Sequence, residues 1–137
     1  MIYLLDTNIC VYLINGNKQL MQKVHEIGSP NLAVSNAVLA ELYYGAYNSA
    51  KVKYNLVTIE AFSKHLTIFP DSVESARLFG RIKADLKLQG RPIEDFDILV
   101  ASIAIANNCI LVTHNTNHFS RISDLTVEDW LTPAEVL

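Results

Sequence analysis

The chain begins MIYLLDTNICVYLI over residues 1–14, and this stretch sets the expectation for the fold. Ile2–Leu5 is a short apolar run of the kind that forms a buried strand. Asp6-Thr7-Asn8 follows, with side chains suited to cap a helix, and Ile9–Ile14 predicts that helix. A buried strand that leads through a polar turn into a helix is typical of α/β proteins.

The same stretch resembles a secretion signal only superficially. It lacks a basic first segment, and Asp6 interrupts the apolar run. Elsewhere the longest mostly apolar run is Ile98–Ala106, far short of the ~20 residues that span a bilayer. We therefore expect a cytoplasmic protein that does not associate with membranes.

Apolar runs and helical patterns alternate along the rest of the chain. Further strands are predicted at Leu32–Val34, Leu66–Phe69, Cys109–Val112 and Leu125–Val127, and helices at Leu20–Ile27, Ala37–Tyr47, Lys53–His65, Val73–Leu88 and Asp95–Ala106. The 137 residues are 50% apolar and contain no linker or repeat, which predicts one domain over residues 1–137. We predict an α/β fold with a central, mostly parallel sheet of four to five strands and helices on both faces.

Polar segments follow three of the predicted strands. They are Asp6-Thr7-Asn8, Ser35-Asn36 and Thr113-His114-Asn115. Ligands of open parallel sheets bind at the carboxyl ends of the strands. The sequence therefore predicts a functional site where these segments meet.

Three carboxylates have surroundings that are unusual for surface acids. Asp6 directly follows a buried strand, Glu41 is the only charge in AVLAELYYGAY at 37–47, and Asp97 opens the apolar run at 98–106. Each has an ordinary alternative: Asp6 and Asp97 as helix caps, and Glu41 in a buried salt bridge or at an edge that reaches water. In a parallel sheet all three can also converge at one edge, where their oxygens would bind Mg²⁺ or Mn²⁺.

Charge and cysteine content narrow the classes of function. The net charge is −3, which argues against a simple basic nucleic-acid-binding module but not against an enzyme that contacts phosphates through cations. Cys10 and Cys109 lie in apolar segments, so we expect two reduced, buried thiols and no zinc site. The basic residues that could guide RNA are Arg77, Arg81, Lys83, Lys87 and Arg91, although a solvated helix surface explains each one singly.

Five segments carry a resemblance to a known family. They are LLDTNICVYLI at 4–14, SNAVLAELYYGA at 35–46, GRPIEDFDILVASIA at 90–104, LVTHNTNHFSRI at 111–122 and LTVEDWL at 125–131. In order and spacing they resemble the PIN-domain ribonucleases, and closely the VapC toxins of bacterial toxin–antitoxin pairs. The resemblance covers the chain from end to end.

This resemblance implies a metal-dependent endoribonuclease toxin that hydrolyses phosphodiester bonds in structured RNA, with tRNA as the expected substrate. The residues expected in catalysis are Asp6, Glu41, Asp97 and Asn115, the first three as ligands of Mg²⁺ or Mn²⁺, with Thr7 and Thr113 lining the pocket. The family's fourth acidic position falls on Asn115, whose carbonyl oxygen can bind a metal but adds no negative charge.

The resemblance also implies protein partners. We expect a homodimer and a small VapB-like antitoxin that blocks the site and forms a hetero-oligomer with the toxin. The apolar segment Leu42-Tyr43-Tyr44 and the helix predicted at Lys53–His65 could supply part of that surface.

Several alternatives stay open at this point. His114 and His118 could act as a general acid or a metal ligand, although an exposed polar loop is the simpler interpretation. A phosphoacceptor signalling domain has a similar size and needs an acidic pocket with Mg²⁺, but paired acids after the first strand and a Lys after the fifth are missing. A catalytically weak or inactive PIN-like module could act only as a binding or repressor partner.

Overall fold

A computed structural model describes residues 1–131, and residues 132–137 of the expected domain lie outside the described residues. The described chain contains a five-stranded sheet in the order β3-β2-β1-β4-β5, in which every neighbouring pair is parallel. The strands are β1 (Ile2–Leu5), β2 (Leu32–Ser35), β3 (Thr67–Phe69), β4 (Cys109–Val112) and β5 (Val127–Glu128). The predicted parallel α/β sheet is confirmed.

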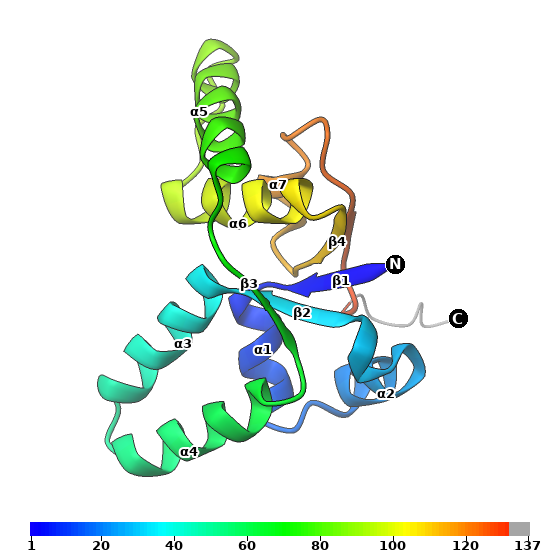
Figure 1. Ribbon diagram of the computed structural model, residues 1–137, viewed down its shortest axis with the longest axis vertical. Helices are drawn as coiled ribbons and strands as arrows, with labels where there is room; N and C mark the ends of the chain where they lie inside the picture. The colour runs from blue at the N-terminus through cyan, green and yellow to red at the C-terminus, as the bar shows by residue number, and fades with distance from the viewer. Residues whose placement is uncertain (132–137) are drawn as a thin grey trace.

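Helices cover both faces of the sheet. They are α1 (Thr7–Ile14), α2 (Lys18–Ile27), α3 (Asn36–Tyr47), α4 (Val52–Ser63), α5 (Val73–Leu88), α6 (Asp95–Ala106) and α7 (Thr116–Phe119), with a 3₁₀ turn, η1 (Ser29–Asn31), before β2. Figure 1 shows α5, α6 and α7 on one side of the strands and α1 to α4 on the other. Among residues 1–131, no helix is long and apolar enough to cross a bilayer.

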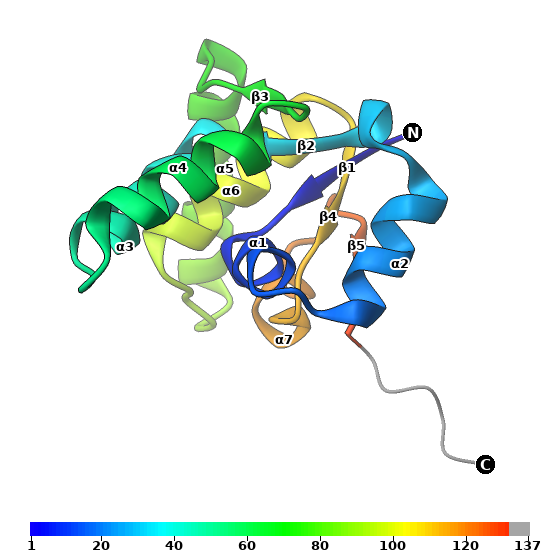
Figure 2. The same cartoon turned by 90° about the horizontal axis from the view of Figure 1, so that it is seen from below.

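β1 is the central strand, and its position determines where the site forms. Leu4 lies beside Ala33 of β2 on one side and beside Leu111 of β4 on the other. The residues that follow β1, β2 and β4 therefore meet at one edge of the sheet. Figure 2 shows α1 continuing from the arrowhead of β1 at this edge.

The core packs α6 against the sheet. Leu4, Leu111 and the α6 residues Val100 and Ile103 are fully buried. A helix surrounded by other elements needs apolar residues on every face, which explains the nearly continuous apolar sequence of α6. Its one buried hydroxyl, that of Ser102, donates to the Ile98 carbonyl at 2.7 Å, so this O–H has a hydrogen-bond partner inside the core.

The two cysteines behave as expected for apolar side chains. Cys10 and Cys109 are both buried and form no disulfide. Burial raises the pKa of both thiols, that of Cys109 to about 11. Thiolates of either residue are therefore scarce at neutral pH, and neither residue is suited to act as a nucleophile or a metal ligand.

Some element boundaries differ from the predictions for local reasons. Asn17, expected in the segment that ends the first helix, caps α2, because its side chain accepts the Leu20 N–H at 3.0 Å. β5 lies at Val127–Glu128 rather than Leu125–Val127, in register with Leu111 and Val112 of β4. The short helix α7 was not predicted, because a single turn is too short to show apolar periodicity.

Candidate active site at the carboxyl edge of the sheet

Asp6 stands at the end of the central strand and is only 5% exposed. Its Oδ1 accepts the Thr7 N–H at 2.9 Å, so Asp6 does cap α1. Its Oδ2 accepts the hydroxyl of Thr113, which follows β4, at 2.8 Å. The capping interpretation is therefore correct but incomplete, since the same carboxylate is also anchored to a second strand end.

Thr113 extends this connection into the loop after β4. The residue is fully buried, and its hydroxyl oxygen accepts the backbone N–H of Asn115 at 3.0 Å while its O–H donates to Asp6. One hydroxyl thus fixes both the orientation of the Asp6 carboxylate and the start of α7. Thr113 and Asn115, both predicted as site residues, lie in direct connection with Asp6.

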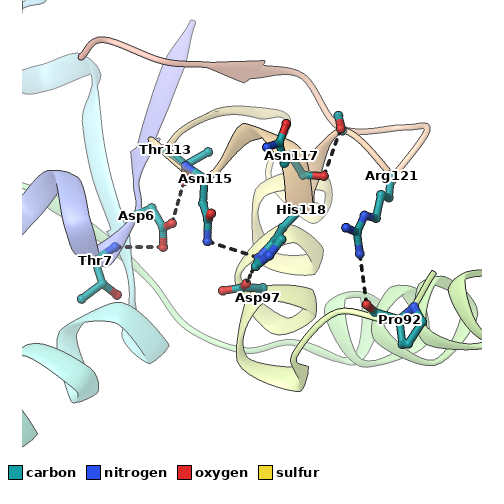
Figure 3. A network of polar contacts seen from close by, with 10 residues as sticks. Asp6, Thr7, Pro92, Asp97, Thr113, Asn115, Asn117, His118 and Arg121 are labelled. Atoms are coloured by element: carbon teal, nitrogen blue, oxygen red, sulfur yellow. Dashed lines mark hydrogen bonds and ion pairs between the residues drawn. The ribbon is translucent and has the colours of Figure 1, made fainter. Parts of the chain in front are cut away.

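Asp97 joins the same network from α6. Its Oδ2 lies 3.3 Å from Nδ1 of His118 on α7, and that nitrogen lies 3.2 Å from Nδ2 of Asn115 (Figure 3). Asp6 and Asp97 are close enough for their charges to interact. The expectation that His118 occupies an exposed loop is wrong. His118 lies on the helix α7, and its ring, although 40% exposed, contacts the site carboxylate of Asp97. His114 instead pairs with Asp129 at 3.0 Å, away from this network.

Glu41 approaches the site from α3, close enough to Asp6 and Asp97 for their charges to interact. Its neighbours Val38 and Leu42 are buried, but Glu41 itself is exposed, so it occupies an edge position rather than a buried salt bridge. Partial desolvation raises the pKa of Glu41, and the negative charges of Asp6, Asp97 and Glu94 raise it further. The buried Thr7 hydroxyl faces Glu41 and offsets part of this rise, although it has no hydrogen-bond partner of ordinary geometry.

The three acids at the start of α6, Glu94, Asp95 and Asp97, have different surroundings. Asp95 forms an ion pair with Lys83 of α5 at 2.9 Å and is turned away to the surface. Glu94 occupies the N-cap position of α6 but makes no capping hydrogen bond with its side chain. Asp97 is 14% exposed and points to the site. The helix start therefore does not explain the position of Asp97.

The electrostatics of the edge indicate a site that lacks positive charge. Burial raises the pKa of Asp6 and the Asp97 charge adds to the rise, while the hydrogen bonds from Thr113 and Thr7 lower it. Within residues 1–131, no Lys or Arg lies within salt-bridge distance of Asp6, Glu41 or Asp97. Clustered carboxylates repel one another, so a cation at this edge would be bound favourably.

The residues fit a divalent cation by their chemistry, although they do not form a closed cage. In the described part of the chain, no three His, Cys, Asp or Glu side chains are grouped closely enough to hold a metal. The unpaired Thr7 hydroxyl and the uncompensated acids nevertheless provide oxygen donors for a hard cation that keeps several waters. Asp6, Glu41 and Asp97 are therefore suitable ligands.

A pocket of about 470 Å³ lies beside this edge, between α1, α3 and α4. Thr7 and Glu41 line its end nearest the acids. Its other walls include Val11, Ile59 and Tyr44. The pocket is therefore largely apolar and reaches the acidic edge at Thr7 and Glu41.

Comparisons with known proteins agree with this geometry. A family model described as PIN domain matches residues 3–125. The chain is 40% identical over 132 residues to ribonuclease VapC2 of Rickettsia felis, covering 95% of this chain and 98% of that protein. It is 34% identical over 128 residues to the tRNA(fMet)-specific endonuclease VapC of Shigella flexneri, covering 93% and 97%. The chain belongs to the PIN-domain VapC toxins.

Solved structures support the same assignment. The VapBC2 complex of Rickettsia felis bound to a promoter DNA fragment matches with a TM-score of 0.90 and 38% identity, over 95% of this chain and 99% of that chain. The DNA-bound VapBC of Salmonella typhimurium also matches with a TM-score of 0.90, at 29% identity over 95% and 98%. The resemblance inferred from the sequence is confirmed: this is a ribonuclease toxin family of toxin–antitoxin systems, and the phosphoacceptor alternative falls away.

Two residues near the site carried no signal that the sequence analysis could use. His118 was considered but discounted, because its proximity to Asp97 depends on α7, which was not predicted. Arg121 directly follows this turn, and its guanidinium donates to the Pro92 carbonyl at 3.1 Å, which ties α7 to the segment before α6 (Figure 3).

Proposed function

We propose that this VapC-family protein is a metal-dependent endoribonuclease that cleaves structured RNA, with tRNA as the expected substrate. Asp6, Glu41 and Asp97 would hold Mg²⁺ or Mn²⁺. The observation that supports this most is the convergence of three acids from three separate elements with no Lys or Arg beside them in residues 1–131. Folding alone gives no reason for such an arrangement, because it destabilises the metal-free protein.

The reaction is hydrolysis of a phosphodiester bond. Water adds to the phosphorus and the 3′ oxygen leaves, so the products carry a 5′-phosphate and a 3′-hydroxyl. A divalent ion held at this edge by Asp6, Glu41 and Asp97 would supply positive charge for the phosphate, for the attacking water and for the leaving oxygen. The 2′-hydroxyl of RNA is not the nucleophile, so a pair of catalytic histidines is not required.

The chain's own residues position these components. Two hydrogen bonds, from Thr7 N–H and the Thr113 hydroxyl, fix both oxygens of Asp6. Thr113 also holds Asn115 at the start of α7, where the Asn115 amide faces the Asp97 side of the site. Glu41 is exposed and lines the neighbouring pocket, so it meets substrate and solvent from the open side. Asn115 contributes a neutral oxygen rather than a fourth negative charge.

The substrate class follows from relatives rather than from any one residue. The Shigella flexneri relative is named a tRNA(fMet)-specific endonuclease, and the relative from Salmonella typhimurium, at 30% identity, carries the same description. We extend tRNA to this chain as the class of substrate. The basic side chains of α5 that remain exposed, including Arg77 and Lys87, are available to contact the RNA backbone.

A small VapB-like antitoxin is the proposed protein partner. Solved relatives are VapBC complexes. The pocket between α1, α3 and α4 offers apolar walls beside the acids, and Tyr44 at its rim is 68% exposed, whereas Leu42 of the same segment is buried. An apolar segment with one basic side chain directed at Glu41 would fill this pocket and block the site. We also propose a homodimer, and a monomer at every concentration in light scattering would contradict it.

The first experiment incubates purified, antitoxin-free protein with total bacterial RNA and Mn²⁺ or Mg²⁺, with and without EDTA. The matched variants are Asp6→Asn and Asp124→Asn, since Asp124 is a surface acid paired with Arg81 at 2.9 Å. We expect a few discrete fragments with 5′-phosphate ends from the wild type and Asp124→Asn, and none from Asp6→Asn or with EDTA. Mapping the fragment ends identifies the RNA target.

Cleavage that persists in Asp6→Asn would remove Asp6 from the proposed site. Complete absence of cleavage by folded wild-type protein under every metal would favour the alternative of an inactive PIN-like binding or repressor module.

A further inference from the structure

His118 lies where three polar side chains converge. Its Nδ1 is 3.3 Å from Asp97 Oδ2 and 3.2 Å from Asn115 Nδ2. The three residues come from α6, from the start of α7 and from within α7, and Figure 3 shows them directed at one another.

Hydrogen bonding alone does not satisfy this arrangement. A carboxylate oxygen only accepts, an amide nitrogen only donates, and a ring nitrogen either donates or accepts. Nδ1 of His118 therefore serves Asp97 or Asn115, and not both. Rotating the Asn115 amide by half a turn exchanges its nitrogen for its carbonyl oxygen, an alternative that heavy-atom positions do not distinguish. In that orientation, the Asp97 carboxylate and the Asn115 carbonyl both present lone pairs to Nδ1 of His118.

The spacing of these atoms matches that of neighbouring ligands on one cation. Ligands about 2.1–2.2 Å from an octahedral ion, at right angles to each other, are about 3 Å apart. The observed separations of 3.3 and 3.2 Å lie close to this value. One cation bound to all three atoms would use a lone pair of the Asp97 carboxylate, of the His118 imidazole and of the Asn115 carbonyl together.

We infer that His118 binds the active-site cation through Nδ1, beside Asp97 and the Asn115 carbonyl, and that this nitrogen ligand makes the site prefer Mn²⁺ to Mg²⁺. The inference rests on the metal site of the proposed function. Mg²⁺ binds oxygen ligands almost exclusively, whereas Mn²⁺, a first-row transition metal, shares the preference for oxygen but also accepts an imidazole nitrogen. The neutral amide at Asn115 favours Mg²⁺ less than a carboxylate would, which strengthens the preference.

The test loads the purified full-length protein with Mn²⁺ alone and records electron spin echo modulation. An imidazole nitrogen bound to Mn²⁺ gives a ¹⁴N modulation that oxygen ligands do not give. The variants are His118→Asn, which keeps a polar group near the Nδ1 position, and His114→Asn as a matched control, because His114 pairs with Asp129. We expect ¹⁴N modulation in the wild type and His114→Asn, and its loss in His118→Asn.

Calorimetric titration of the same proteins with Mn²⁺ and with Mg²⁺ provides the second readout. His118→Asn should weaken Mn²⁺ binding about tenfold or more and Mg²⁺ binding much less, while circular dichroism remains unchanged. Mn²⁺ bound without ¹⁴N modulation, with an unchanged ratio of the two affinities in His118→Asn, would overturn this inference and leave the proposed nuclease intact. Absence of Mn²⁺ binding in the wild type would overturn the metal site itself.

Discussion

Two groups of acids in this protein have opposite surroundings. On the α5 side, Asp124 and Asp95 are 59% and 63% exposed and each lies 2.9 Å from a cation, Arg81 or Lys83. At the carboxyl edge of the sheet, Asp6 is 5% exposed and Asp97 is 14% exposed, and their nearest charged neighbours include other acids. The same chemical group is thus paired with Arg or Lys in one region and, in the described residues, has no Arg or Lys beside it in the other.

The difference separates what stabilises this fold from what the site requires. Exposed ion pairs of the first kind contribute about 0–1 kcal/mol and are screened by salt. Partly buried acids that face one another oppose folding in the absence of a cation, as the raised pKa values of Asp6 and Glu41 indicate. Acids of the second kind are therefore the ones to assign to function.

The largest expected effect comes from neutralising an acid at the carboxyl edge of the sheet, compared with an acid of the exposed group. Asp97→Asn should reduce RNA cleavage by more than ~100-fold, because loss of a ligand exceeds the 10–100-fold effect of losing a group that only supports a ligand. Asp124→Asn should leave cleavage within about twofold. Cleavage rates of both variants on the mapped RNA fragment measure the difference. Similar losses in both would show that overall charge, rather than the carboxyl edge, controls activity.

A smaller effect is expected from the side chain that orients Asp6. Thr113→Val removes the hydroxyl that donates to Asp6 and accepts the Asn115 N–H, so cleavage should fall about 10–100-fold. Thr113→Ser keeps the hydroxyl and should restore most of the rate. If Thr113→Ser is as slow as Thr113→Val, the methyl group rather than the hydrogen bonds is responsible.

The smallest expected effect is on the stability of the metal-free protein. Because the pKa of Asp6 is raised on folding, the folded state binds more protons than the unfolded state as pH rises above about 4. Stability is therefore lost as pH rises through the pKa of folded Asp6. Asp6→Asn should remove this loss and raise the melting temperature at pH 7 by about 2–5 °C, with a smaller gain at pH 4.

Differential scanning calorimetry in EDTA, with Asp124→Asn as the control, checks this prediction. Saturating Mn²⁺ should reverse the order, because the wild type then gains stability from binding that the variant lacks. A lower melting temperature for metal-free Asp6→Asn at pH 7 would show that the two hydrogen bonds to Asp6 outweigh its burial.

The sequence predicted most of the framework, since buried parallel strands are short apolar runs and β1, β2 and β4 all have this form. It also placed Asp6 and Asp97 next to predicted strand or helix ends, where their position follows from chain direction alone. The central place of β1 was not predicted, because strand order depends on which strands pair and not on the pattern within each one.

Details that depend on tertiary contacts could not be predicted from the apolar pattern of the sequence either. The stripe containing Val38, Glu41 and Leu42 predicted an acid among core residues, but Glu41 lies at the edge of the buried face of α3 and reaches water, while Val38 and Leu42 are buried. The position of His118 depends on one helical turn and on Arg121, which holds that turn near α6. Neither contact leaves a periodic trace in the sequence.

The hydrogen bond between Thr113 and Asp6 joins residues 107 positions apart, which has a consequence for the chain while it is being made. Asp6 leaves the ribosome well before Thr113, because 107 residues separate them. At about 5–20 residues per second, roughly 5–20 s separate their synthesis. A nascent toxin therefore has no assembled site until β4 and Thr113 have been made, and a product cut short before β4 lacks the partner that orients Asp6.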